Sequence, residues 1–106
     1  MTNEDLRRLA LALPETEEKS HFDKADFRVR NKIFASLKDE ATGVIKLSPE
    51  EQSVMAEAEP EVFQSLPGGW GHKGWTKVIL AKADETTLRS ALQTAWRNVA
   101  PRTLKI

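Results

Sequence analysis

The sequence predicts an α+β domain in which helices pack on one face of an antiparallel sheet and leave the other face open. Three observations predict this fold. Apolar residues recur with helical spacing near both ends of the chain, short β-patterned runs follow one another in between, and a strongly capped helix separates two groups of these runs. The length of 106 residues fits one hydrophobic core, so we expect a single domain over residues 1–106.

The first helix is predicted at the start of the sequence. Its apolar face has the i, i+3, i+4, i+7 spacing of a helix and consists of Leu6, Leu9, Ala10 and Leu13. Thr2 is placed to cap this helix, and Asp5 follows three residues later, which is close to a capping box. Pro14 is expected to end the helix. An acidic, polar connection over residues 15–20 is expected to follow.

The next predicted element is a strand that alternates apolar and basic residues. Phe27 and Val29 are expected to face inward. Arg28 and Arg30 are then expected to share the outer face of the same strand.

Two further strands are predicted to complete an antiparallel meander. Asn31-Lys32 is the expected hairpin connection, because asparagine tolerates the left-handed backbone that such turns demand. The chain is then expected to return as a strand over residues 33–37, to form a polar loop over 38–43, and to add a third strand over 44–47.

The second half of the chain begins with a clear helix signal. Ser48 is an N-cap, Pro49 takes the first helical position, where no N–H is needed, and Glu51 completes a capping box. The later elements are a short strand over 61–64, a strand over 75–80 and a last helix that begins after Asp84. The predicted order is therefore α-β-β-β-α-β-α, with the short strand as a possible addition.

Charge is balanced overall but divided along the chain. Sixteen basic and sixteen acidic residues give a net charge of zero. Residues 28–48 and 62–106 are nevertheless net basic, while residues 1–27 and 49–61 are net acidic. A basic face is therefore compatible with a neutral chain, although the total is less basic than that of most nucleic-acid-binding domains.

One segment, residues 66–75, holds four of the five glycines and two of the three tryptophans. Its glycine spacing matches a dinucleotide fingerprint, but that motif opens a helix, whereas a β-patterned run follows here. We expect an extended wing that presents Trp70, His72 and Lys73 to a partner. In the alternative, the tryptophans cover the end of the sheet and the glycines shape a turn. We expect Trp70 at the surface and Trp75 in the core.

A second basic cluster lies on the predicted first hairpin and consists of Arg28, Arg30 and Lys32. Such charges usually form a solvated strand face, and in isolation they do little. Their functional interpretation is contact with phosphates, to which Lys77 on the later strand would add.

Several function classes lack support in the sequence. There is no cysteine, so neither a disulfide nor a thiolate metal site is possible. His21 and His72 lack a paired ligand motif, and we expect His21 to cap or pack. No nucleophile–base pair is identifiable, so we expect neither an enzyme nor a cofactor. With no signal-peptide core and no membrane-length apolar run, we expect a cytoplasmic protein without a membrane partner.

Three motifs in order resemble the MmcQ/YjbR family. They are His21-Phe22-x-Lys24-x-x-Phe27-Arg28-Val29-x-x-Lys32-Ile33-Phe34-Ala35, then Leu47-Ser48-Pro49-Glu50-Glu51, then Pro67-Gly68-Gly69-Trp70-Gly71-x-x-Gly74-Trp75. The resemblance spans nearly the whole chain, and it departs from the family pattern at Asn31, where the family usually has glycine. It implies a fold like that of CyaY, the bacterial frataxin, and a double-wing mode of DNA binding.

The leading hypothesis is a monomeric, non-enzymatic protein that binds duplex DNA through two basic wings. Its expected contact residues are Arg28, Arg30, Lys32, Trp70, His72, Lys73 and Lys77. The alternative is a small-ligand or protein-interaction module that uses a pocket beside the glycine–tryptophan segment. Iron binding by analogy with frataxin is less favoured, because the first helix offers only Glu4 and Asp5 beside two arginines.

Overall fold

The protein is described by a computed structural model that covers residues 1–21 and 24–106, with the backbone alone described at His21. Within these residues six antiparallel strands form one sheet in the order β1-β2-β3-β4-β6-β5. The strands are β1 (Thr16–His21), β2 (Lys24–Val29), β3 (Lys32–Asp39), β4 (Thr42–Lys46), β5 (Phe63–Ser65) and β6 (Trp75–Ile79). The helices are α1 (Asn3–Leu11), α2 (Pro49–Ala58), α3 (Gly69–His72), α4 (Glu85–Val99) and a 3-10 turn, η1 (Leu80–Lys82).

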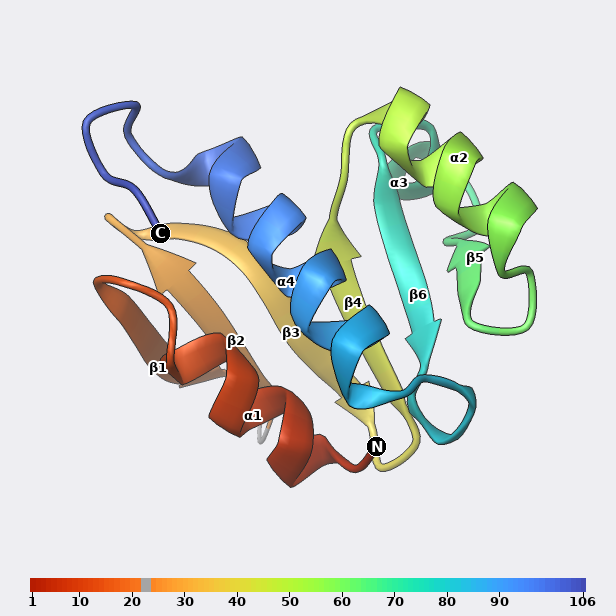
Figure 1. The fold of residues 1–106 in the computed structure, drawn as a ribbon, viewed down its shortest axis with the longest axis horizontal. Coiled ribbons are helices and arrows are strands. Elements are labelled where there is room, and N and C mark those ends of the chain that lie inside the picture. Colours follow the sequence, from red (N-terminus) through yellow and green to blue (C-terminus); the bar gives the residue numbers. More distant parts are fainter. Residues whose placement is uncertain (22–23) are drawn as a thin grey trace.

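The α+β class and the packing of helices on one face of the sheet are confirmed. Helix α4 lies over the central strands β3 and β4, α1 lies beside it toward β1, and α2 lies over the β5 side of the same face (Figure 1). Local capping produces the three predicted helix starts. Thr2 with Asp5 and Ser48 with Glu51 each form a complete capping box, and the Asp84 side chain accepts the Thr87 backbone N–H.

Strand β1 is a correction to the predicted polar connection over residues 15–20. It pairs along its whole length with β2, from Thr16 opposite Val29 to His21 opposite Lys24. Exposed charged residues dominate it, because a strand at the edge of a sheet needs only one hydrogen-bonding neighbour and no apolar face. Such a strand carries little alternation in its sequence. His21 was expected to cap or pack, but its side chain lies outside the described residues.

The β2–β3 turn is also shifted by one residue from the prediction. Arg30 and Asn31, with φ of 50° and 66°, form the turn, and Lys32 is already the first residue of β3. Two successive left-handed residues are typical of the tight hairpin turn that matches strand twist. Arg30 therefore does not share the outer strand face with Arg28, as the alternation had indicated.

The hydrophobic core lies between the sheet and the α1–α4 layer. Its largest fully buried side chains are Trp96, Phe27, Phe34, Leu6, Ile45, Leu47, Leu80, Leu88 and Leu92. Trp96 is anchored in this core because its indole Nε1 donates a hydrogen bond to the carbonyl oxygen of Pro14, at 3.0 Å. The predicted inward residues Phe27 and Val29 are both fully buried.

The opposite face of the sheet is not covered by α1, α2 or α4. Among the described elements, α3 and the segment before it rise over this face, which we call the open face (Figure 1). Any candidate site on the sheet is therefore expected here, where strand side chains reach solvent.

Candidate functional site

Cross-strand pairing defines which residues share the open face. Asp26 pairs with Ser36, Ser36 with Val44, and Val44 with Lys77, so these four form one row across β2, β3, β4 and β6. Residues two positions away on the same strand point to the same side of the sheet. The lysines that this pattern and the groove place on the open face are Lys19 on the edge strand β1, and Lys24, Lys38, Lys46 and Lys77 on the strands beside it.

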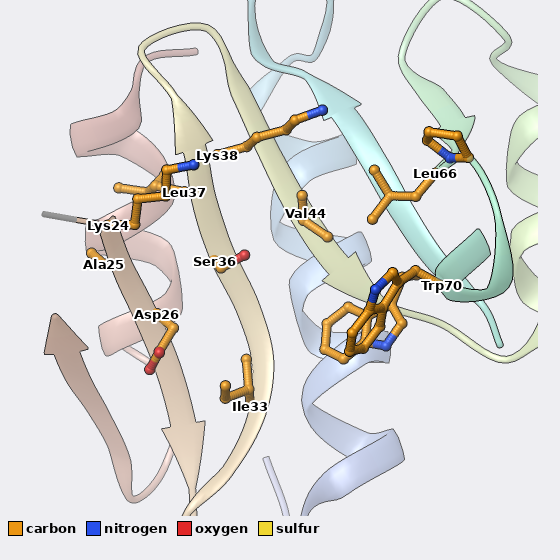
Figure 2. Close-up of a pocket in the computed structure, with 12 residues that line it drawn as sticks. Lys24, Ala25, Asp26, Ile33, Ser36, Leu37, Lys38, Val44, Leu66 and Trp70 are labelled. Atoms are coloured by element: carbon orange, nitrogen blue, oxygen red, sulfur yellow. The ribbon is translucent and has the colours of Figure 1, made fainter. Parts of the chain in front are cut away.

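A groove of about 550 Å³ crosses the middle of this face. Its described lining consists of Lys24, Ala25, Asp26, Ile33, Ser36, Leu37, Lys38, Val44, Leu66, Pro67, Trp70 and Trp75. Figure 2 shows Trp70 at one end, Leu66 on the wall from the segment before α3, and Lys24 and Lys38 at the other end. Trp75 also lines the groove and packs against Trp70. The groove is therefore apolar along most of its length, with cations at one end.

The two tryptophans meet edge to face at the wall of the groove. Their ring centroids are 6.0 Å apart and the ring planes are inclined by 71°, a geometry that aromatic pairs favour. Trp70 is 63% exposed, which confirms its expected surface position. The expectation that Trp75 lies in the core is wrong: it is half-buried and pairs with Lys46 on the open face, while its neighbour Thr76 takes the inward position.

The glycine-rich segment is a one-turn helix rather than an extended wing over residues 69–72. A Cβ on Gly71 would lie 1.9 Å from the carbonyl oxygen of Leu66, so only glycine fits there. Gly74 has φ of +100°, and its own carbonyl accepts the Leu47 N–H at 3.1 Å. These close backbone approaches explain the glycines through local structure and fix the base from which Trp70 projects.

Lysines flank both indoles. The Lys46 ammonium lies 5.5 Å from the Trp75 ring centroid and donates a hydrogen bond to the Lys73 carbonyl oxygen. The Lys73 ammonium lies 5.9 Å from the Trp70 ring centroid. Both distances are within the range of cation–π attraction. Positive charge therefore also lies beside the indole end of the groove, outside its lining.

Both arginines of the first hairpin are engaged by carboxylates within the protein. The Arg28 guanidinium donates to both Asp26 oxygens, at 2.8 and 3.0 Å, and to Asn31. Arg30 donates to both oxygens of Glu15, at 2.7 and 3.1 Å. The hydrogen bond with Asp26 raises the pKa of Arg28, and the hydrogen bond with Arg30 lowers the pKa of Glu15.

The antiparallel order gathers the sequence-predicted basic elements at one end of the sheet. Strand β3 begins at Lys32, β4 ends at Lys46 and β6 begins at Trp75, so the β2–β3 turn and α3 lie at the same end. Lys32, His72 and Lys73 are exposed there, and Lys77 is half-buried on the open face. Of the predicted set, Trp70 lines the groove and Arg30 turns toward Glu15.

Sequence reasoning missed Lys24, Lys38 and Lys46. Lys46 alternates with the buried residues Ile45 and Leu47, a signal that would have placed it on the outer face. Lys38 lies at a register shift between β3 and β4, so no alternation could have placed it.

The described residues contain neither a cluster that would suggest a metal site nor a helix that would suggest a membrane span. In that part of the chain, no three histidine, aspartate or glutamate side chains gather as a metal ion would require. Over the same residues, every helix is too short or too polar to cross a bilayer.

A family model named YjbR matches residues 11–98, most of the chain. The chain belongs to the YjbR family. The expected resemblance to MmcQ/YjbR proteins is thereby confirmed. No curated protein matches this YjbR-family chain.

Structural comparison supports the fold independently. The crystal structure of Deinococcus radiodurans protein DR2400, with the family-model domain DUF419, is similar with a TM-score of 0.78 and 22% sequence identity. The similarity covers 98% of this chain and 82% of that one. At this level of identity the likeness shows a shared architecture.

Proposed function

We propose that this YjbR-family protein is a non-enzymatic DNA-binding protein that holds the phosphate backbone on the open face of its sheet. One observation carries the proposal: Lys24, Lys38, Lys46 and Lys77 share that face with Trp70 and Trp75. Lysines around a surface with exposed aromatic rings form a charge pattern complementary to nucleic acid.

The charge of the open face supports this partner. Asp26, the carboxylate in the groove, is 8% exposed and both its oxygens are bonded to Arg28. This internal pairing leaves Lys24 and Lys38 as the charged side chains of the groove lining that an approaching anion meets, with the exposed Asp39 and Glu40 beside them in the neighbouring pocket. Glu17 and Lys19 also lie on this side of edge strand β1, where their charges offset each other.

The proposal reassigns the phosphate contacts expected from the sequence. Arg28 and Arg30 form ion pairs with carboxylates of the protein itself. Lysines therefore make most of the proposed phosphate contacts. Lys32, His72 and Lys73 remain expected contacts at the end of the sheet where the β2–β3 turn and α3 lie. The proposal thus keeps the two basic elements of the double-wing hypothesis, the β2–β3 turn and the segment of α3, and adds the groove to them.

No chemical step is part of the proposal. Ser36 is the only hydroxyl among the described residues that line the groove; no histidine lies beside it there, and no described lysine is hydrogen-bonded to it. A serine needs an adjacent base to act as a nucleophile. We therefore propose binding without catalysis and without a cofactor.

The salt dependence of DNA affinity tests the proposal. If about four phosphates are neutralised, the Kd for a short labelled DNA should rise roughly 100-fold between about 50 and 200 mM salt, because counterions are released on binding. Replacing both Lys38 and Lys77 with alanine should lower the salt slope by about 1.5 to 2. Lys105→Ala is the matched control, because Lys105 lies in the C-terminal tail beside α4. Absence of binding at the lower salt would refute the proposal.

Amide chemical-shift changes in an NMR titration with DNA show where on the protein the DNA binds. Shifts should concentrate in β2, β3, β4, β6 and α3, whose residues form the open face. Shifts confined to α1 and α4 would place the contact on the covered face and contradict the proposal.

A small-ligand module is the second candidate, and the groove itself favours it. Its volume of about 550 Å³ lies within the range of small-molecule sites. For this function, Trp70→Ala should abolish binding of a small planar ligand, whereas loss of Lys77 should have little effect. Loss of affinity on replacing Lys77, whatever the effect of Trp70→Ala, supports the DNA-binding function.

A further inference from the structure

We infer that the groove on the open face accepts one unpaired base, so that the DNA bound there is single-stranded. This inference rests on the proposed function and names the form of DNA that fits the site. In it, the base stacks against Trp70, and the phosphate beside it lies near Lys24 and Lys38 at the other end of the groove (Figure 2).

The lining of the groove decides between single and double strands. Eight of its described lining residues are apolar or aromatic: Ala25, Ile33, Leu37, Val44, Leu66, Pro67, Trp70 and Trp75. A duplex keeps its base faces stacked inside and offers mainly phosphates and groove edges to a protein surface. An unpaired base has free apolar faces, and single-strand binding proteins stack such bases on aromatic side chains. An apolar groove is therefore complementary to a single strand.

The indole pair is built to receive a flat ring. Trp70 is 63% exposed, yet it is held edge to face against Trp75 and its backbone lies in α3. Gly71 and Gly74 fix that segment by their close approach to Leu66 and Leu47. An aromatic side chain already held in place loses little conformational freedom on binding, which favours stacking.

Polar and charged side chains lie at the positions where a bound nucleotide would present its base edge and its phosphate. Ser36 is half-buried on the groove floor and offers a hydroxyl donor and acceptor to a base edge. Lys24 and Lys38 are exposed at the end of the groove away from the indoles. Lys46 and Lys77, on β4 and β6, lie on the same face and extend the basic surface past the groove. A strand can thus cross the face with one base inserted and phosphates on either side.

Paired oligonucleotides provide the test. A single strand of about 12 nucleotides, within the usual site range, is compared with its own duplex by fluorescence anisotropy, in wild type, Trp70→Phe and Trp70→Ala. We expect the single strand to bind more tightly than the duplex. Trp70→Ala should weaken single-strand binding by about 5- to 150-fold, the range found for lost base stacking. Trp70→Phe should retain most of the affinity, since phenylalanine also stacks.

Two controls separate binding from folding. Urea unfolding of Trp70→Ala should match wild type, because the side chain is largely exposed. Intrinsic tryptophan emission should be quenched only in part by the single strand, because the third tryptophan, Trp96, is buried in the core far from solvent. Trp70→Phe should reduce the quenchable fraction and leave the share that belongs to Trp75.

Each remaining outcome has one meaning. Binding of the duplex as tightly as the single strand, or more tightly, overturns the inference and leaves DNA binding intact. A mononucleotide that binds as tightly as the oligonucleotide also overturns it, since the groove is then a small-ligand site. Failure of both DNA forms to bind at about 50 mM salt refutes the proposed function itself.

Discussion

At Gly74 the backbone turns with φ of +100° and passes beside Leu47 as β6 begins. A Cβ at this position would lie 1.9 Å from the Leu47 carbonyl oxygen. The neighbouring side chains of the candidate site depend on this contact, because Trp75 follows directly and Trp70 projects from the preceding turn. At the residue scale, glycine is required for geometry, and the tryptophans and lysines are the residues through which we propose binding.

Gly74→Ala should destabilise the fold by about 3 kcal/mol, since alanine strains at positive φ and clashes with the backbone of Leu47. The free energy of unfolding in urea measures this. Gly69→Ala is the matched control: a Cβ there meets nothing within 4 Å, and the change should stay within about 1 kcal/mol. Similar effects of both substitutions would show that the close approach to Leu47 contributes little.

At the element scale, α4 illustrates how a local signal sets a helix end. The Asp84 side chain accepts the Thr87 backbone N–H at 2.7 Å. This hydrogen bond lowers the pKa of Asp84 from its ordinary value of 3.8. A carboxyl with a lowered folded-state pKa adds stability that is present above its unfolded pKa and is lost as the pH falls through the folded pKa.

Asp84→Ala should therefore lower Tm by a few degrees near neutral pH, as expected for a lost N-cap. The difference from wild type should shrink as the pH falls below the unfolded-state pKa of Asp84 and through its lowered folded-state pKa, where the wild-type carboxyl becomes protonated. Thermal unfolding followed by circular dichroism over this pH range measures both effects. Asp84→Asn keeps a neutral capping oxygen, so its Tm should show no such carboxyl-dependent loss. A pH-independent gap between wild type and Asp84→Ala would rule out the charged cap.

The elements differ in how much of them the sequence could predict. Helix starts at Ser48 and Asp84 depend on side chains within three residues, so local spacing was sufficient. Strand β1 depends on pairing with β2, and its polar residues show no inward alternation. The turn of α3 depends on the close approach of Gly71 to Leu66. No helical pattern in the local sequence predicts this contact.

At the scale of the whole molecule, Trp96 joins the end of the chain to its beginning. It is 1% exposed, and its Nε1 donates to Pro14, 82 positions earlier. Through this contact α4 is fixed against the turn after α1, which completes the helical layer on the covered face. The other face then stays free for the groove.

Trp96→Phe should cost about 2 to 3 kcal/mol, because it leaves a cavity and removes the partner of the Pro14 carbonyl. The urea midpoint should fall with the slope unchanged, as expected when stability alone changes. Trp70→Phe, at an exposed site, should change stability by less than about 0.5 kcal/mol. An equal loss in the two variants would contradict the anchoring role of Trp96.

The sequence by itself determined the α+β class, the capped helices, the family and the importance of the glycine–tryptophan segment. Each of these depends on residues close in the chain or on a recognisable motif. Only the tertiary structure decided that Lys24, Lys38, Lys46 and Lys77 share a face with Trp70 and Trp75, and that Arg28 and Arg30 are held by Asp26 and Glu15. The reason is physical: strand register and the β-bulges assign side chains to a face, and both are fixed by pairing between distant strands.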